Sequence, residues 1–371
     1  MSTGFVLAAG GTGGHLFPAE AVAAELIRRG RKVHLLTDAR TDALAGRDAG
    51  IEIHHVRAGR LGGGPVLAAR GLAELAAGTW QARRLLSRLM PAGVVGFGGY
   101  ASVPTMLAAA YLGLPTVIHE QNAVLGRANR LLAPRVRHIA TGFPETAGLR
   151  AADHARIVHT GNPVRPAFLG VTEAGYEAPL SGEPIEILVL GGSQGAHIFS
   201  EIVPLALARL PMRRRAVLRV SQQARPEDLG AVAQAYAQTG IAAQIESFFT
   251  DVPSRLVRAH LVICRAGAST VAELAAIGRP AVLVPYPHAA DDHQSANARA
   301  FAKAGGGWVV AQADLRPDTL ALRLESLFGD GAALAAAARR AGGFGRRHAT
   351  RHLADLALAL EPAAARQGRA A

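Results

Sequence analysis

The chain has 371 residues, of which half are hydrophobic and only 5% are aromatic. This length is enough for two domains, each with its own core. Lysine and arginine outnumber aspartate and glutamate by 40 to 28, and a net charge of +12 favours anionic partners. A simple bias toward alanine and arginine explains the charge equally well. The chain lacks the basic block of a nucleic-acid arm and is poor in stacking aromatics, so we expect no nucleic-acid partner.

One cysteine and the distribution of apolar residues bear on the compartment. Cys264 is the only cysteine, so an intrachain disulfide is excluded and a reducing cytoplasm is favoured. It lies in the apolar run 261–264, which predicts a buried strand residue rather than a nucleophile. The first residues enter an apolar strand directly, so we expect no signal peptide. No stretch of about 18 apolar residues predicts a transmembrane helix.

Short apolar runs alternate with helical patterns along the whole chain, which is typical of parallel sheets covered by helices on both faces. A first helix is expected from Pro18 to Arg29, and the proline- and glycine-rich segment 161–184 is expected to link two domains. The predicted strands lie near residues 4–9, 32–37, 51–56, 94–97, 115–118, 136–140, 185–190, 216–220, 242–246, 261–264, 281–284 and 308–310.

Two glycine-rich loops, 10–15 and 191–197, each follow an apolar strand and precede a helical pattern. A turn of this kind exposes backbone N–H groups at the positive end of a helix dipole, which suits a phosphate. Neither loop has the lysine of a P-loop, and the first lacks the dinucleotide-binding spacing. The alternative is a tight turn without a ligand. Two such loops together predict two nucleotide-type domains and a substrate that carries a diphosphate.

His15 ends the first glycine loop at the start of a helix, where a neutral imidazole can act as a general base. The alternative is a hydrogen bond to the backbone. A third glycine cluster, 96–102, follows the strand near 94–97, and the polar residues 119–122 follow the next strand. Ligands bind beyond the carboxyl ends of such strands, and these side chains suit a sugar. The alternative for Glu120 is a loop that holds two elements together.

Three further segments have a ligand-binding interpretation beside a structural one. An arginine at a domain junction, Arg165, can pair with a diphosphate or act as a strut between domains. In the segment 265–273, backbone N–H groups can receive phosphate while Glu273 binds a ribose, although Ser269 or Thr270 with Glu273 also resembles a capping box. The segment 291–297 is rich in aspartate and histidine, but its spacing favours Asp291 as a helix cap over a metal site.

These segments, in this order, resemble the MurG family of UDP-N-acetylglucosamine-dependent N-acetylglucosaminyltransferases of peptidoglycan synthesis, in glycosyltransferase family 28. The matching motifs span about residues 5 to 300: GGTGGH at 10–15, GFGGYAS at 96–102, HEQN at 119–122, TGNPVR at 160–165, GGSQGA at 191–196, the stretch 265–273, and DDHQ at 291–294.

The resemblance implies an α/β protein with the GT-B fold, in which two Rossmann-like, doubly wound parallel-sheet domains face a cleft. The implied acceptor-binding and membrane-facing domain is 1–162, and the implied UDP-GlcNAc-binding domain is 163–340. A C-terminal helix at about 341–360 is expected to pack back on the first domain. The tail 361–371 is expected to be disordered.

The resemblance also implies roles for single residues. Thr12, Gly13, Gly14 and the side chain of Asn122 would lie near the donor sugar and the acceptor. The donor diphosphate would meet Arg165 and Ser193, and the uracil would meet Phe249. Ala268, Ser269 and Thr270 would hold the phosphate. Glu273 would bind the ribose, and Gln294 would bind the GlcNAc hydroxyls. Ser269 replaces a more usual leucine, which should do little harm to a backbone contact.

The implied reaction moves GlcNAc from UDP-GlcNAc to the C4 hydroxyl of the muramoyl sugar of lipid I, with inversion, to form lipid II and UDP. His15 is the candidate base, with Glu120 or a water as the alternative, and no metal or other cofactor is expected. Competing hypotheses are a UDP-GlcNAc 2-epimerase and a non-catalytic cell-wall scaffold. The HEQN and TGNPVR segments argue against the epimerase.

The polyprenyl tail of lipid I implies a peripheral location at the cytoplasmic face of the inner membrane, with cell-wall and division proteins as candidate partners. The segment 65–90 suits a helix that docks on anionic lipid. Trp80 would sit at the membrane interface, and the alternative is a core-packed helix with a solvated basic face. The side chains assigned to docking are Leu72, Leu75, Leu86, Leu89, Arg70, Arg83, Arg84 and Arg88.

Overall fold

The computed structural model describes residues 4–10, 13–38, 50–59, 64–171, 175–192 and 195–361. The chain divides into two compact units, which are treated separately below. The first unit comprises Met1–Arg165 together with His348–Ala371, and the second comprises Pro166–Arg347. The last helix therefore belongs to the same unit as the start of the chain.

The first unit is built on a parallel sheet with the strand order β3-β2-β1-β4-β5-β6-β7. The order reverses between β1 and β4, which creates the switch point where open α/β sheets bind ligands. Its strands are β1 (Phe5–Ala8), β2 (Val33–Thr37), β3 (Ile51–His55), β4 (Gly93–Gly96), β5 (Thr116–Glu120), β6 (His138–Thr141) and β7 (Ile157–His159).

Each strand expected from the sequence overlaps an observed strand. The structure differs from the expectation in two places. Strand β7 was not expected, because three half-buried residues give too short a pattern to identify. Strand β5 continues through Glu120, so His119 and Glu120 are strand residues and not part of a loop. Both side chains are consequently held by the sheet.

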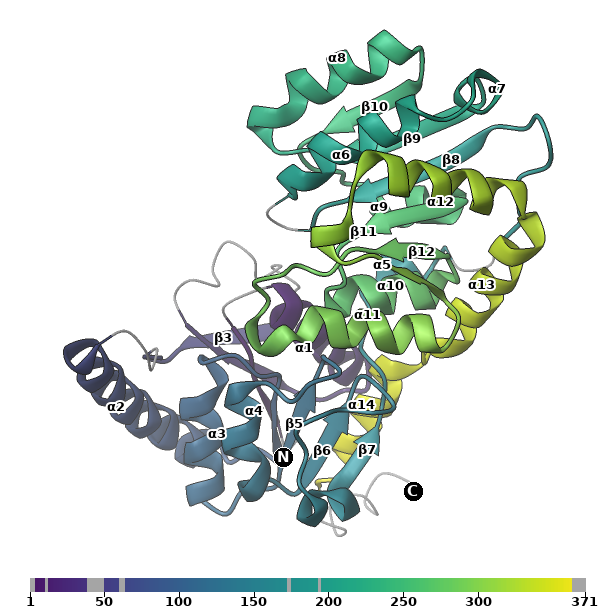
Figure 1. The fold of residues 1–371 in the computed structure, drawn as a ribbon. Helices are drawn as coiled ribbons and strands as arrows, with labels where there is room; N and C mark the ends of the chain where they lie inside the picture. Colours follow the sequence, from purple (N-terminus) through teal and green to yellow (C-terminus); the bar gives the residue numbers. More distant parts are fainter. Residues whose placement is uncertain are drawn as a thin grey trace. The chain divides into compact units, whose positions relative to one another are not determined.

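Helices cover both faces of the first sheet (Figure 1). One face packs on α1 and α14, and the other packs on α2, α3 and α4. The long α2 comes close to the preceding chain, since a Cβ on Gly78 would collide with the carbonyl of Arg57. The bounds are α1 (Gly13–Arg28), α2 (Pro65–Leu89), α3 (Ser102–Tyr111), α4 (Arg127–Leu132) and α14 (Ala349–Leu358).

The first helix begins five residues earlier than the sequence suggested, at Gly13 instead of Pro18. The expectation was wrong because Pro18 was taken to mark the first turn. Proline removes only the hydrogen bond that its N–H would make to Gly14, which is itself in the first turn of the helix. The earlier start places His15 inside the helix.

The second unit repeats the design with a parallel sheet in the order β10-β9-β8-β11-β12-β13. Its switch point lies between β8 and β11, directly beside the second glycine loop. Its strands are β8 (Ile185–Leu190), β9 (Leu218–Gln223), β10 (Ala242–Glu246), β11 (Leu261–Cys264), β12 (Ala281–Leu283) and β13 (Gly307–Val309). Cys264 is fully buried in β11, as expected for a core residue.

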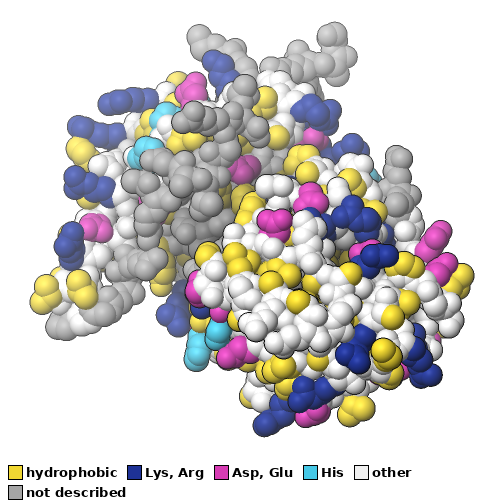
Figure 2. Space-filling model, turned by 90° about the horizontal axis from the view of Figure 1, so that it is seen from above, with side chains coloured by type: hydrophobic (Ala, Val, Ile, Leu, Met, Phe, Trp, Pro, Cys, Tyr) yellow, Lys and Arg dark blue, Asp and Glu magenta, His cyan; other side chains and the backbone are white. Residues whose placement is uncertain are grey.

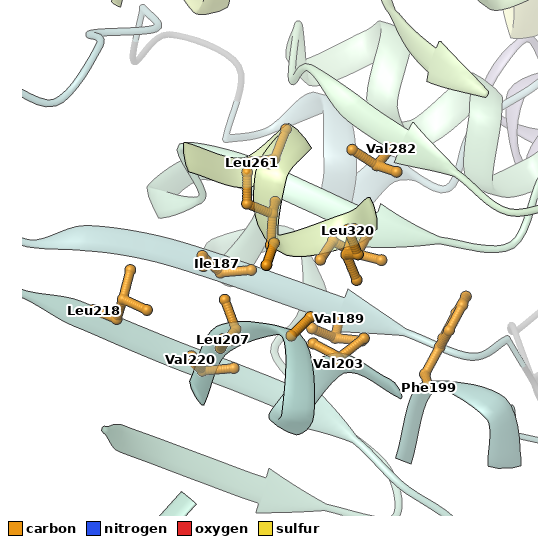
Figure 3. Close-up of a cluster of buried hydrophobic side chains, with 14 of the residues drawn as sticks. Ile187, Val189, Phe199, Val203, Leu207, Leu218, Val220, Leu261, Val282 and Leu320 are labelled. Carbon is orange, nitrogen blue, oxygen red and sulfur yellow. The ribbon is translucent and has the colours of Figure 1, made fainter. Parts of the chain in front are cut away.

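One face of the second sheet carries a large apolar core formed with α6, α8 and α12. Figure 3 shows side chains of β8 and β9 pointing toward Val203 and Leu207 of α6. The bounds are α5 (Pro166–Leu169), α6 (His197–Ala208), α7 (Met212–Arg215), α8 (Leu229–Thr239), α9 (Val252–Arg258), α10 (Ala268–Ile277), α11 (His293–Lys303), α12 (Pro317–Gly329) and α13 (Gly331–Phe344).

Among the described residues, no helix combines the length and apolar character that crossing a bilayer requires. On the face drawn in Figure 2, lysine and arginine side chains are dispersed among apolar and acidic ones.

Candidate active site

The first half of the candidate site lies at the carboxyl end of β1. Thr12 lies outside the described residues, and Gly13 and Gly14 form the first turn of α1. A Cβ on Gly13 would lie 2.7 Å from Cε2 of Phe17, so a side chain there would have to displace that ring. His15 follows as the third residue of the helix.

The glycine cluster after β4 fits closely around His15. Gly98 and Gly99 both have positive φ angles, 81° and 72°, which favour glycine. A Cβ on Gly99 would lie 2.9 Å from the carbonyl oxygen of Gly10 and 3.1 Å from Cδ2 of His15. The third glycine cluster therefore lets the backbone approach the imidazole ring, a role that its sequence alone did not reveal.

Gln121 determines how the imidazole of His15 is protonated. Its Nε2 atom donates to the carbonyl of Phe97 at 2.9 Å, and a carbonyl can only accept. The other amide atom, Oε1, therefore faces Nδ1 of His15 at 3.2 Å. Because Oε1 is also an acceptor, Nδ1 of His15 carries the hydrogen. In the neutral ring, Nε2 then keeps its lone pair.

His119 forms a hydrogen bond with the side-chain amide of Gln121. Its side chain is fully buried, and burial lowers the pKa of His119 to about 4, so the ring is neutral at neutral pH. Its Nε2 donates to the carbonyl of Gly161 at 3.1 Å, which leaves Nδ1 to accept from Nε2 of Gln121 at 3.1 Å. The side-chain amide of Asn162 also donates to the backbone carbonyl of Gln121 at 2.8 Å. A connected network thus runs from Gly161 to His15.

Glu120 is enclosed by donors. Its Oε1 accepts from the backbone N–H and the side-chain amide of Asn122, at 3.0 and 3.2 Å. Its Oε2 accepts from the backbone N–H of Gly126 and from Nδ2 of Asn129, both at 2.9 Å. Both carboxylate oxygens are therefore engaged in holding the loop after β5, and the side chain is buried. This is the loop-organising role that the sequence left as an alternative.

Arg165 ends the first unit and approaches the first helix. Its guanidinium carbon lies 5.0 Å from the centre of the Phe17 ring. A guanidinium over a ring face is attracted to the negative charge of that face. The ring of Phe17 thus gives Arg165 a defined position beside α1, the helix that carries His15.

In the second unit, the glycine loop after β8 is fixed by Gln223. The Oε1 atom of Gln223 accepts from the N–H of Gly191 at 3.2 Å, and its Nε2 donates to the carbonyl of Gly192 at 3.1 Å. Gly192 and Gly195 have positive φ angles. Ser193 lies outside the described residues. The side chain of Gln223 therefore acts as a rigid bracket for the described part of this loop.

The N-terminus of α10 follows β11 and is capped differently from the sequence expectation. The cap residue is Gly267, and no side chain makes a capping hydrogen bond. Ser269 and Thr270 lie inside the first turn instead, so the expected capping box is wrong; glycine supplies the extended cap conformation without a side chain. The N–H groups of Ala268, Ser269 and Thr270 are thus left without an intrahelical acceptor, the arrangement that binds phosphate.

Gln294 joins the loop after β11 to the loop after β12. Its Oε1 accepts from the N–H of Ala266 at 3.2 Å and from the N–H of Tyr286 at 3.0 Å. One turn later, Asn297 donates to the carbonyl of Ala266 at 3.0 Å. The two side chains of α11 therefore bind both the backbone N–H and the backbone carbonyl of Ala266, just before α10.

Asp291 does not cap α11 as expected. The cap residue is Asp292, without a side-chain capping bond, and both aspartates have positive φ angles of about 50°. That left-handed conformation of Asp291 places it in the tight turn that precedes the helix.

Phe249 and Phe248 differ in exposure. The side chain of Phe249 is 4% exposed and lies under Arg255, whose guanidinium carbon is 4.1 Å from the ring centre. Phe248 is 68% exposed. The Arg255 side chain is itself fixed by Asp251 at 2.7 Å and by Ser221 at 2.8 Å. Phe249, which the resemblance assigns to the uracil, is therefore held in place by Arg255, whereas the ring of Phe248 is exposed to solvent.

Arg265 was not assigned a role from the sequence, although it follows β11 at the switch point. It donates to the carbonyls of Val284 and Pro285, each at 3.2 Å, and to Gln312 at 2.7 Å. Burial lowers the pKa of the Arg265 guanidinium. An arginine directly after an apolar strand and before a small-residue turn was the available signal.

The long helix α2 does not present the leucine stripe that the sequence suggested for docking. Leu86 is buried, and Leu75 and Leu89 pack on the core, because one stripe of the helix must cover the sheet. Of the side chains expected at the docking surface, Leu72 and Trp80 are exposed, and the other large exposed apolar side chains in and next to α2 are Val66, Leu67 and Met90.

Two arginines stand on this exposed part of α2. The guanidinium carbon of Arg84 lies 3.9 Å from the Trp80 ring centre, and that of Arg83 lies 4.6 Å from the Tyr111 ring centre. Cationic and amphipathic aromatic groups therefore occur together.

Comparison with known proteins supplies the family. Residues 5–141 match the N-terminal domain of glycosyltransferase family 28, and residues 186–354 match its C-terminal domain. A Rhodospirillum centenum protein, named UDP-N-acetylglucosamine–N-acetylmuramyl-(pentapeptide) pyrophosphoryl-undecaprenol N-acetylglucosamine transferase, is 57% identical over 95% of this chain and 93% of its own length. The protein of the same name from Paramagnetospirillum magneticum is 55% identical over 96% of each chain.

A solved structure agrees with these relatives. The crystal structure of Acinetobacter baumannii MurG matches with a TM-score of 0.79 and 32% identity, over 96% of this chain and 99% of that one. The two parallel, Rossmann-like sheets and this match confirm the expected fold class. The chain therefore belongs to glycosyltransferase family 28 and has the GT-B fold of its MurG members.

Proposed function

We propose that the chain transfers GlcNAc from UDP-GlcNAc to the C4 hydroxyl of MurNAc in undecaprenyl-diphospho-MurNAc-pentapeptide, so that lipid I becomes lipid II and UDP is released. The names of relatives that are 55–57% identical over nearly the whole chain support this reaction. The observation in the chain itself that carries the proposal is the fixed imidazole of His15, whose Nδ1 is occupied by Gln121.

His15 is the general base. Its Nε2 removes the proton from the acceptor hydroxyl as that oxygen forms a bond to C1 of GlcNAc and the bond from C1 to the UDP oxygen breaks. A single displacement of this kind inverts the configuration from α to β. A base that is already oriented and in the correct tautomer spends no free energy on reorganisation during the reaction.

Glu120 organises the site instead of taking the proton. Four hydrogen-bond donors surround its two oxygens, so protonation of this carboxylate would break contacts that hold the loop after β5. Asn122, which is fixed by Glu120, is then presented to the sugars together with Thr12, Gly13 and Gly14. The base and its supporting loop are thus assigned to the first unit, which we propose binds the acceptor.

The second unit binds the donor. The N–H groups of Ala268, Ser269 and Thr270 receive the donor diphosphate, and the dipole of α10 stabilises the charge that grows as UDP departs. Arg165 and Ser193 add contacts to the same diphosphate, and the guanidinium suits two phosphate oxygens at once. Groups of the chain itself therefore stabilise the negative charge of the departing UDP.

Contacts to the rest of the donor follow from the same loops. Glu273, one turn into α10, accepts from the two ribose hydroxyls. Gln294 uses Oε1 to hold the loops around β12, which leaves its amide hydrogens for the GlcNAc hydroxyls. Phe249 forms one wall of the uracil pocket. Specificity for the donor therefore rests on side chains that are fixed before the donor binds.

We also propose that α2 docks on the cytoplasmic face of the inner membrane, where the polyprenyl tail of the acceptor is anchored. Support comes from the exposed Leu72 and Trp80 beside the exposed Arg83, Arg84 and Arg88. Apolar and aromatic side chains suit the interface, and arginines suit anionic headgroups. Docking of this kind holds the enzyme at the surface without a spanning helix.

The proposed reaction is tested with purified protein, UDP-GlcNAc labelled in the sugar, and a short-chain lipid I analogue, with EDTA present. We expect equimolar UDP and a β-1,4-linked disaccharide lipid, identified by NMR. Conversion of UDP-GlcNAc without the acceptor would instead support the 2-epimerase. A donor that binds and is not consumed in the presence of acceptor, with or without added divalent cations, would contradict the transferase.

A further inference from the structure

Three potential metal ligands converge on one face of the first sheet, in strands that the proposed reaction does not use. His34 is the second residue of β2, and Glu52 and His54 are the second and fourth residues of β3. Side chains two residues apart on a strand point to the same face, and His34 pairs in register with Glu52. The topology therefore brings all three side chains together.

The distances among the three ligand atoms are those of a coordination site. Nδ1 of His34 lies 3.2 Å from Nε2 of His54 and 3.1 Å from Oε2 of Glu52, and the latter two atoms are 3.9 Å apart. A triangle with these sides has a circumradius of about 2.0 Å, which equals the usual Zn–N and Zn–O bond length. One point is thus at bonding distance from all three atoms.

A hydrogen-bonded cluster explains this arrangement less well. Nδ1 of His34 has either one hydrogen or one lone pair in the ring plane, yet it faces both His54 and Glu52 within 3.2 Å. A single hydrogen satisfies one of these neighbours, whereas a cation satisfies every pair at once. His34 is 8% exposed, so water has little access to this ring.

The donor set indicates which cation fits. Two imidazole nitrogens and one carboxylate oxygen suit zinc and similar transition metals, whereas magnesium and calcium prefer oxygen ligands alone. The Glu52 side chain is 67% exposed, so solvent can reach the Glu52 side of the site. We propose that His34, Glu52 and His54 form a binding site for Zn²⁺, with water as the fourth ligand.

The position of the site indicates a structural role. It involves β3, the edge strand of the sheet, which is half-exposed and pairs with β2. The candidate catalytic residues lie at or after the carboxyl ends of β1 and β5, whereas the three ligands lie within β2 and β3. Zn²⁺ would therefore tie the edge strand to the sheet without touching the reacting groups, and it would stabilise the folded first unit by mass action.

The test is isothermal titration of the untagged full-length protein, stripped of metal, with ZnCl₂ and in parallel with MgCl₂. We expect one equivalent of Zn²⁺ to bind and the melting temperature to rise, with no response to Mg²⁺. Loss of an outer-shell partner alone costs about 10- to 100-fold in metal affinity, so His54→Gln and Glu52→Gln should each weaken binding by about 100-fold or more.

His55→Gln is the matched control, because His55 is the next residue of β3 and points to the opposite face. This variant should bind Zn²⁺ like the original protein. Circular dichroism of each variant verifies that it is folded. Co²⁺ gives a second readout, since a tetrahedral site produces intense visible absorption that His54→Gln should abolish. Absence of Zn²⁺ binding, or equal affinity in the His54→Gln and His55→Gln variants, would overturn the proposal.

Discussion

Nδ1 of His15 donates to Oε1 of Gln121 across 3.2 Å, and the carbonyl of Phe97 fixes the orientation of that amide. The tautomer of the candidate base is therefore set by a residue that does not itself react. Both residues lie in glycine- or amide-rich motifs, and their relationship becomes visible only when β1 and β5 are placed in one sheet.

Replacing Gln121 should impair the chemical step more than donor binding. Gln121→Leu keeps a similar volume but removes the acceptor for Nδ1 of His15. We expect kcat to fall by about 10- to 100-fold, a part of the 10²–10⁴ that a general base contributes. The KM for UDP-GlcNAc should stay within about twofold, because the donor contacts are assigned to other residues. Steady-state kinetics with varied donor would reveal the opposite pattern if Gln121 served donor binding.

Burial of His119 should make the stability of the protein dependent on pH. The pKa is about 4 in the folded protein and about 6.5 when unfolded, so the unfolded chain takes up the proton first as the pH falls. Folding stability should therefore be unaffected above pH 6.5 and should decrease by about 3 kcal/mol between pH 6.5 and 4. Urea unfolding across this range measures the loss. His119→Gln does not titrate there, and an equal pH dependence in this variant would refute the assignment.

The N-terminus of α10 can be tested by removing one backbone N–H. Ala268 is the first helical residue, and Gly267 before it has an extended backbone with ψ 145°, so Ala268→Pro should fit the helix. Loss of one charge-assisted hydrogen bond should weaken UDP binding by about 10- to 100-fold, with little change in melting temperature. Ser269→Leu, which keeps every N–H, is the control and should bind UDP normally. Calorimetry with UDP distinguishes them, and unchanged affinity in Ala268→Pro would exclude the phosphate contact.

Membrane docking through α2 predicts a charge-dependent affinity for vesicles. Each arginine near an anionic surface contributes about 1 kcal/mol, so Arg83→Ala, Arg84→Ala and Arg88→Ala combined should weaken binding to phosphatidylglycerol vesicles by about 100-fold. The same number of changes at the exposed Arg323, Arg339 and Arg346 of the second unit is the control for net charge. Co-sedimentation measures both proteins. A triple α2 variant that loses activity while it still binds vesicles would argue against docking.

The strands and their parallel arrangement could be predicted because buried β-strands leave nearly continuous apolar runs, as in 185–190 and 261–264. Helix ends were harder. Pro18 and the Ser269–Glu273 pair gave plausible local signals for helix starts, but the helices begin at Gly13 and at Ala268. Local side-chain preferences are weak, and at α10 the extended backbone of Gly267 marks the boundary instead.

Residues brought together from different strands could not be predicted at all. HEQN is a conspicuous motif, yet its separate contacts, Gln121 with His15 and Glu120 with Gly126 and Asn129, appear only in the folded chain. The leucines of α2 illustrate the same limit, because the sequence pattern of an apolar helix face is the same whether that face covers a sheet or contacts a membrane. His34, Glu52 and His54 form a cluster only through the register of β2 and β3.

The most direct test of this account is the single-turnover rate of His15→Ala with UDP-GlcNAc and the lipid I analogue. We expect the rate to fall by about 10²- to 10⁴-fold while UDP-GlcNAc binds with normal affinity, because a base contributes only to the chemical step. His154→Ala, which changes an exposed histidine of the same unit, should react like the original protein. A His15→Ala protein with a near-normal rate would contradict the account, and the proton would then have to leave through water or Glu120.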